Sequence, residues 1–158
     1  MASTSHGFGD TSRADVPRTI ALVVAIVFLL VGIAGFIPGL TTHYGDLKFA
    51  GHMSDAKLLG VFEVSVLHNI VHLLFGVAGI LLARAGRPAE YLIGGGIVYF
   101  VVWLYGVLVD HESSANFVPL NTADNWLHLI LAVGMVALGL YARRWYRGPA
   151  ATPGGRTI

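Results

Sequence analysis

The chain has 158 residues, enough for one domain; 55% of them are hydrophobic, 12% are charged, and the formal net charge is +1. A soluble domain of this size would be about one-quarter charged, so the composition indicates a membrane protein rather than a soluble one. Cysteine is absent, which excludes disulfides, thiolate metal sites and a cysteine nucleophile.

Four runs without a charged residue follow one another along the chain, at residues 19–37, 64–83, 91–109 and 126–142. A helix needs ~20 residues, and at least ~17, to cross the hydrocarbon core of a bilayer. The runs lack the alternation of barrel strands. The sequence therefore predicts an all-α, integral membrane four-helix bundle with helices at about 19–37, 56–83, 89–109 and 124–145.

These helices define one predicted domain at residues 16–146. The flanking segments, 1–15 and 147–158, are rich in Gly, Ser, Thr and Pro and are predicted to be disordered tails.

Basic residues are distributed unequally between the two sides of such a bundle. One side would hold Arg13, Arg18, Arg84, Arg87, Arg143, Arg144, Arg147 and Arg156. The other side would hold only Lys48 and Lys57. Because cytoplasmic loops carry the excess of Lys and Arg, we expect both termini to be cytoplasmic. The expected location is a bacterial inner membrane, with the lipid bilayer as the principal partner.

The pattern Asn-x-x-His-Leu occurs twice, at residues 69–73 and 125–129. His72 precedes Arg87 by 15 residues, and His128 precedes Arg143 by 15. At 1.5 Å per residue both imidazoles would lie about 22 Å from the inner charges. The second and fourth helices run in the same direction, so the chain can be interpreted as two helical hairpins related as a parallel repeat.

Polar and ionisable residues gather in the outer half of the predicted bundle, where they are costly and by default functional. They are Glu63, His68, Asn69, His72, Asp124, Asn125 and His128. His68 and His72 are spaced i, i+4 and share one helix face, whereas Glu63 and His68 do not. Asp124 is placed to cap the fourth helix or to hold one tautomer of His128.

Three functions fit this cluster. In the leading one the protein is non-enzymatic, and the cluster organises the bundle or a partner interface through hydrogen bonds between helices. In the second, His72 and His128 are axial ligands of a haem, or belong to a divalent metal site together with His68 and Asp124. In the third, the cluster conducts protons or a small molecule.

Other classes of function find no support in the sequence. It contains no phosphate-binding loop, no Ser-His-Asp order and no paired carboxylates with catalytic spacing. Nucleic-acid binding is not expected, because the basic residues near the C-terminus are better explained as a membrane-surface anchor. Other membrane proteins, or further copies of the chain, remain candidate partners.

The two motifs resemble those of an uncharacterised family of bacterial four-helix membrane proteins, grouped as a domain of unknown function. The resemblance rests on Glu63-x-x-x-x-His68-Asn69-x-x-His72-Leu73 and on Asp124-Asn125-x-x-His128-Leu129, and it extends over about residues 18–143. It implies four spanning helices in a bacterial inner membrane and no established activity.

Overall fold

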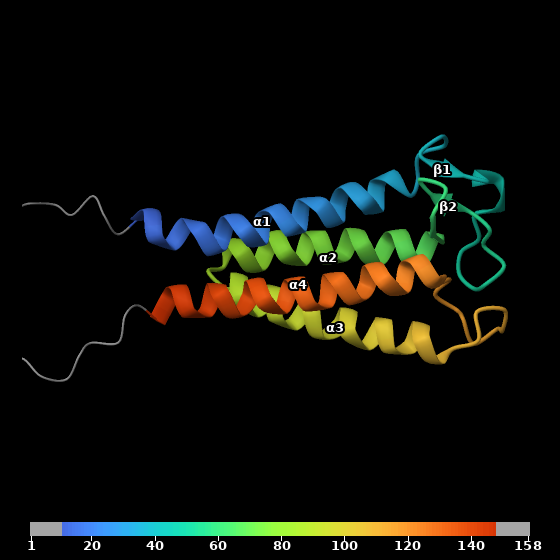
Figure 1. The fold of residues 1–158 in the computed structure, drawn as a ribbon. Helices are drawn as coiled ribbons and strands as arrows, with labels where there is room; N and C mark the ends of the chain where they lie inside the picture. The colour runs from blue at the N-terminus through green and yellow to red at the C-terminus, as the bar shows by residue number, and fades with distance from the viewer. Residues whose placement is uncertain (1–10, 148–158) are drawn as a thin grey trace, which may run out of the picture.

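The computed structural model describes residues 11–147, which form four long helices and a small sheet. The helices are α1 (Thr11–Ala34), α2 (Val66–Arg84), α3 (Pro88–Leu108) and α4 (Thr122–Arg147). They lie side by side, with the sheet and the longer loops at one end and both ends of the described chain at the other (Figure 1). We call these the sheet end and the terminal end. The predicted all-α, four-helix class is confirmed, and all four helices are long and apolar enough to cross a membrane.

The helices pair as two hairpins, because α1 packs most extensively on α2, and α3 on α4. Small residues allow this close approach. A Cβ added to Gly76 of α2 would lie 2.8 Å from the carbonyl oxygen of Ala25 in α1. A Cβ added to Gly96 of α3 would lie 2.9 Å from the carbonyl oxygen of Ala132 in α4. In each hairpin, then, a glycine lets the two backbones lie closer than a side chain would allow.

The second helix begins ten residues later than predicted, at Val66 instead of residue 56. Leu59 and Gly60 both have positive φ, which is incompatible with a continuous helix and makes a turn instead. Ser65 then caps α2, since its hydroxyl accepts a hydrogen bond from the backbone N–H of His68 at 3.1 Å. The segment before Ser65 is strand and turn, so Glu63 does not lie on the helix.

Three two-residue strands cover the sheet end: β1 (Thr41–Thr42), β2 (Lys57–Leu58) and β3 (Phe62–Glu63). They are antiparallel in the order β1-β2-β3, with Leu58 opposite Thr41 and Phe62. A single 3₁₀ turn, Tyr44–Asp46, follows β1. Leu58 is buried with Ala56 and Val64 in a small core of its own, which closes the bundle at this end.

The other helix bounds differ less from the prediction. The first helix begins at Thr11 instead of residue 19 and ends at Ala34 instead of residue 37. Residues 11–15 of the predicted tail therefore belong to α1, and residue 147 ends α4. The remainder of the two predicted tails, 1–10 and 148–158, lies outside the described residues.

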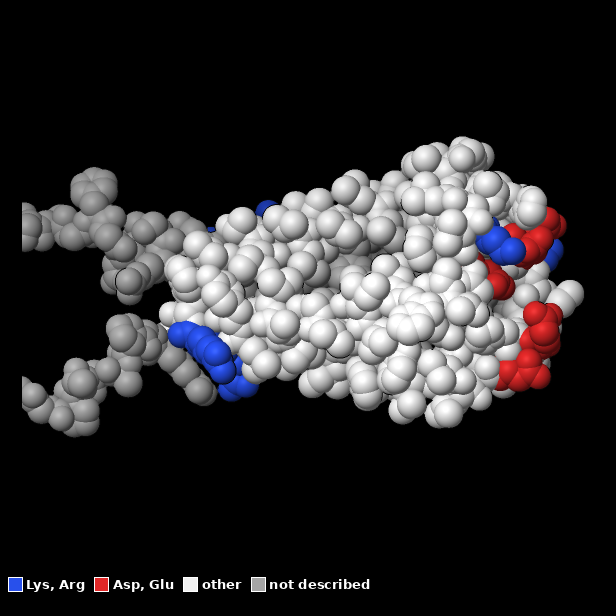
Figure 2. Space-filling model, in the orientation of Figure 1, with Lys and Arg blue, Asp and Glu red and all other residues white. Residues whose placement is uncertain are grey.

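The sides of the bundle are apolar and its two ends are charged. Each helix exposes large aliphatic side chains, among them Leu30, Leu74, Ile97 and Ile130, all more than half exposed. Arginines gather at the terminal end, and most of the acidic residues lie at the sheet end together with two lysines (Figure 2). An apolar belt between two charged ends is typical of a protein that spans a membrane.

Candidate functional site

The buried histidines meet in one cluster of rings that we call the histidine hub, made of Phe28, His68, His72, Tyr99 and His128. Every helix contributes at least one of these side chains, and all five are at most 7% exposed. The rings of His68 and His72 stack at 4.6 Å and 6°, which confirms that the two residues share a helix face. His128 of α4 lies 6.2 Å from His68 and 5.3 Å from Tyr99, between ring centroids.

Hydrogen bonds fix His72 within the hub. Its Nδ1 lies 3.1 Å from the carbonyl oxygen of His68, so Nδ1 carries the proton and donates. Nε2 is then the acceptor, and the hydroxyl of Tyr99 donates to it across 3.4 Å. Phe28 of α1 packs on both partners, at 5.6 Å from His72 and 5.3 Å from Tyr99. The hub thus joins the two hairpins through ring contacts and one hydrogen bond.

The two motif asparagines do not point into the hub. Each packs instead on a glycine of its partner helix, in what we call the asparagine clamps. A Cβ on Gly35, just beyond α1, would overlap the side-chain amide of Asn69, and a Cβ on Gly106 of α3 would overlap that of Asn125. Asn125 also donates from Nδ2 to the carbonyl oxygen of Gly106 at 2.9 Å. Both asparagines are buried and hold one hairpin each at its sheet end.

Asp124 anchors the start of α4 to the sheet. Its Oδ2 accepts hydrogen bonds from the backbone N–H groups of Asn121, at 3.0 Å, and Glu63, at 3.1 Å. The side chain of Asn121 accepts in return from the N–H of Asp124, at 3.0 Å, which completes a capping box. The capping role predicted for Asp124 is confirmed. A bond from Asp124 to His128 is not among its hydrogen bonds within the described chain.

The two hairpins repeat each other's contacts. Ser65 and Asn121 occupy equivalent motif positions, and each accepts from the N–H three residues later. Asn69 and Asn125 make equivalent glycine clamps, and Gly76 and Ala132 make equivalent close contacts with α1 and α3. The first helix of each hairpin, α1 and α3, corresponds as well. A shift of 71 positions along the sequence aligns Pro17, Ala25, Phe28 and Gly35 with Pro88, Gly96, Tyr99 and Gly106. The predicted parallel repeat is therefore visible in the packing.

Sequence reasoning missed Phe28 and Tyr99, which complete the hub. Neither residue is distinctive in its own apolar helix, and no motif surrounds it. The available signal was the 71-residue shift, which pairs them once the glycines of the clamps are aligned. The caps Ser65 and Asn121 were also missed, although Ser and Asn are favoured N-cap residues.

The geometry does not support a metal site at His68, His72 and His128. The stacked rings of His68 and His72 direct their in-plane lone pairs side by side, whereas a bound ion must lie about 2.1 Å from each nitrogen. In the described part of the chain no three His, Cys, Asp or Glu side chains are grouped so that they could hold a metal ion. A haem between His72 and His128 would have to displace Tyr99, which lies against both rings.

A family model described as a domain of unknown function, DUF4383, matches residues 18–141. The chain belongs to this family. The match confirms the predicted membership of an uncharacterised domain family, and it includes both motifs, the hub and the clamps. No curated protein and no solved structure matches the chain.

Proposed function

We propose that this DUF4383 member is a non-enzymatic, multi-pass membrane protein in which the histidine hub locks two helical hairpins into one bundle. The observation that carries the proposal is that the hub takes side chains from all four helices. Contacts between the hairpins are otherwise far fewer than contacts within them. The hub adds polar and aromatic contacts to the apolar core that the two hairpins share.

The proposed location is the inner membrane of a bacterium, with both termini in the cytoplasm. The exposed aliphatic belt supports insertion into a bilayer, because water would not tolerate so much continuous apolar surface. The gathering of arginine at the terminal end supports the orientation.

The burial of the hub favours a role within the bundle over a role at a partner interface. A partner protein cannot contact side chains such as His128, which is 3% exposed. Other membrane proteins or further copies of the chain would have to bind elsewhere, on the helix faces or at the sheet end.

An absorption spectrum and elemental analysis of detergent-purified protein, oxidised and reduced, test the proposal against cofactor binding. We expect a colourless, metal-free protein, and we expect His72→Ala and His128→Ala each to lower the free energy of unfolding by on the order of 2 kcal/mol. His52→Ala, in the loop between β1 and β2, is the control and should change the free energy of unfolding little. A Soret band or near-stoichiometric metal that disappears in His72→Ala would overturn the structural role.

A second candidate, conduction of protons or a small polar molecule, is favoured by four atoms of the site. Within the described residues, His68 Nδ1, Asn69 Nδ2, Asn125 Oδ1 and His128 Nδ1 are buried without a hydrogen-bond partner. Buried polar atoms ordinarily have one, so these positions suit water or a small polar molecule. Proton flux into proteoliposomes with an internal pH dye would test this function. Flux equal to that of empty liposomes would contradict it.

A further inference from the structure

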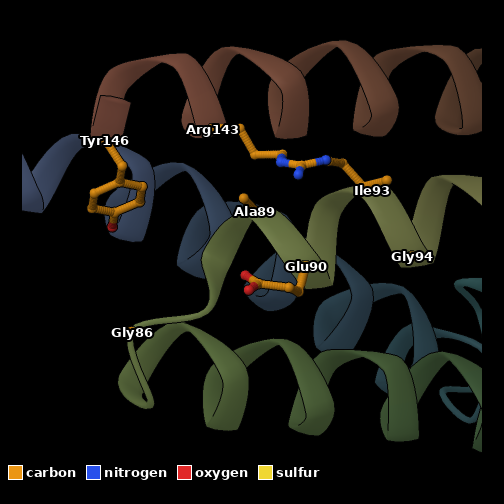
Figure 3. A pocket seen from close by; sticks show the side chains of 7 residues that line it. All are labelled: Gly86, Ala89, Glu90, Ile93, Gly94, Arg143 and Tyr146. Atoms are coloured by element: carbon orange, nitrogen blue, oxygen red, sulfur yellow. The ribbon is translucent and has the colours of Figure 1, made fainter. Parts of the chain in front are cut away.

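A groove opens at the terminal end between α3, the connection from α2 and the last turns of α4. Its volume is about 530 Å³, and its lining includes Gly86, Glu90, Ile93, Arg143 and Tyr146. Figure 3 shows Arg143 extending from α4 toward Ile93, while the carboxylate of Glu90 turns toward the end of α3 nearest Gly86. Both charged side chains thus border the same groove but come from different helices.

The two charges are available for a ligand. Arg143 makes no ion pair or hydrogen bond with another described residue. Glu90 lies 3.8 Å from Nε of Arg87, and both side chains are more than half exposed. Such surface pairs are worth little, so the carboxylate of Glu90 can exchange this partner for a better one at small cost.

The groove continues into an apolar one. A second hollow of about 420 Å³ lies between α2 and α3 and shares Glu90 and Gly94 with the first. Leu74, Phe75 and Leu82 form part of its almost entirely apolar wall. A ligand that occupied both hollows would place polar groups beside Arg143 and Glu90 and an aliphatic chain along the helices.

The position along the bundle matches the boundary between lipid headgroups and hydrocarbon. Arg84 ends α2 near this level, and Tyr141 and Trp145 lie close by on α4 with their rings 5.5 Å apart. Tyr, Trp and Arg are the residues that mark such a boundary in membrane proteins.

We propose that the paired hollows bind one phospholipid with a phosphoethanolamine headgroup. Its phosphate pairs with the guanidinium of Arg143, which suits bidentate phosphate binding. Its primary ammonium donates to the carboxylate of Glu90, and one acyl chain lies along the α2–α3 hollow. A choline headgroup has no N–H to donate to Glu90, and a glycerol headgroup has no positive charge to pair with it. This site is independent of the histidine hub.

Native mass spectrometry of the detergent-purified protein tests the site. Phosphatidylethanolamine, phosphatidylcholine and phosphatidylglycerol with identical acyl chains are added in turn at equal concentration. We expect the ethanolamine lipid to bind best, and Arg143→Gln to weaken its binding about fivefold, the size of one interfacial ion pair. Glu90→Gln should weaken binding of the ethanolamine lipid until it equals binding of the choline lipid.

A steric variant has a matched control. A Cβ on Gly94, in the shared wall of the hollows, meets no atom within 4 Å, and the same is true of Gly134 on α4. Gly94→Leu should fill the groove without disturbing the helix packing and should weaken binding of all three lipids. Gly134→Leu, outside both hollows, should leave binding unchanged.

Four results would overturn the site. Equal binding of the three lipids would refute the headgroup selection, and so would unchanged binding of the ethanolamine lipid in Glu90→Gln. Competition by phosphoethanolamine without acyl chains, as strong as that of the lipid, would show that the apolar hollow is unused. A dimer that Gly94→Leu dissociates would assign the groove to a second copy of the chain.

Discussion

The hydroxyl of Tyr99 donates to Nε2 of His72 across 3.4 Å, which makes a direct polar link between α3 and α2 inside the bundle. We expect Tyr99→Phe, which keeps the ring contacts, to lower the free energy of unfolding by about 0.6 kcal/mol, the average for such bonds in membrane proteins. Tyr141→Phe, exposed on α4, serves as the control in denaturant titrations in detergent. If Tyr99→Phe lowered the free energy of unfolding no more than Tyr141→Phe does, the hydroxyl of Tyr99 would not be joining the hairpins.

The asparagine clamps leave no room for a methyl group at Gly35 or Gly106. Gly35→Ala and Gly106→Ala should each destabilise the protein by roughly 1–3 kcal/mol, the usual cost of overpacking. Thermal unfolding in the same detergent would measure both. Gly134→Ala, which has open space, should be neutral or slightly stabilising because alanine favours a helix. Because the two clamps are equivalent in the repeat, we expect Gly35→Ala and Gly106→Ala to lower the stability by similar amounts. Destabilisation by only one of the two substitutions would contradict this equivalence.

Asp124 fixes the start of α4 to β3 through two backbone N–H groups. Asp124→Ala should lower the free energy of unfolding by roughly 2 kcal/mol, because the backbone N–H groups of Glu63 and Asn121 lose a buried acceptor and are left unpaired. Hydrogen exchange at the amides of Glu63 and Asn121 should become faster. Asp110→Ala removes a comparable acceptor of the Glu112 amide in an exposed loop and should change the free energy of unfolding much less. Unchanged exchange at Glu63 would show that the anchor is not needed.

The pH dependence of stability should reflect Glu63. Burial raises the pKa of its carboxyl above the ordinary value of 4.5, although Lys57 partly offsets this. The folded state therefore binds the proton more tightly than the unfolded state. The resulting stabilisation is complete below pH 4.5 and is lost as the pH rises through the pKa of the folded protein.

Unfolding midpoints of the wild type and Glu63→Gln, measured across this pH range, would isolate the contribution. We expect the wild type to lose stability relative to the variant as the pH rises. A wild type that gained stability relative to the variant would mean that the pKa is lowered instead.

The hydrophobic pattern was sufficient to predict the helices, because a span of a membrane requires a long apolar run wherever it occurs. It failed between residues 56 and 65, where Leu59 and Gly60 turn the chain and two-residue strands form. Such short strands have too few residues to show an alternating pattern, and pairing with β1 decides their conformation.

The candidate site was predictable in part. The spacing of His68 and His72 placed them on one face, and the repeated motif placed His128 at a similar depth. The clamp role that Asn69 and Asn125 share, distinct from that of the histidines, was not predictable because it depends on glycines of the partner helices. An imidazole and an amide in one motif look like a single polar site, whereas the helical twist directs one toward the hub and the other toward the neighbouring helix.

The order in which the ribosome makes the chain gives the hub a further consequence. Each clamp needs only its own hairpin, so the first can close before the second has been synthesised. The hub needs a side chain from α4, and His128 leaves the ribosome after α1, α2 and α3. Until then His68 and His72 lack their partner from α4, and a chain cut short before residue 128 would leave the membrane quality-control proteases an incomplete bundle to recognise.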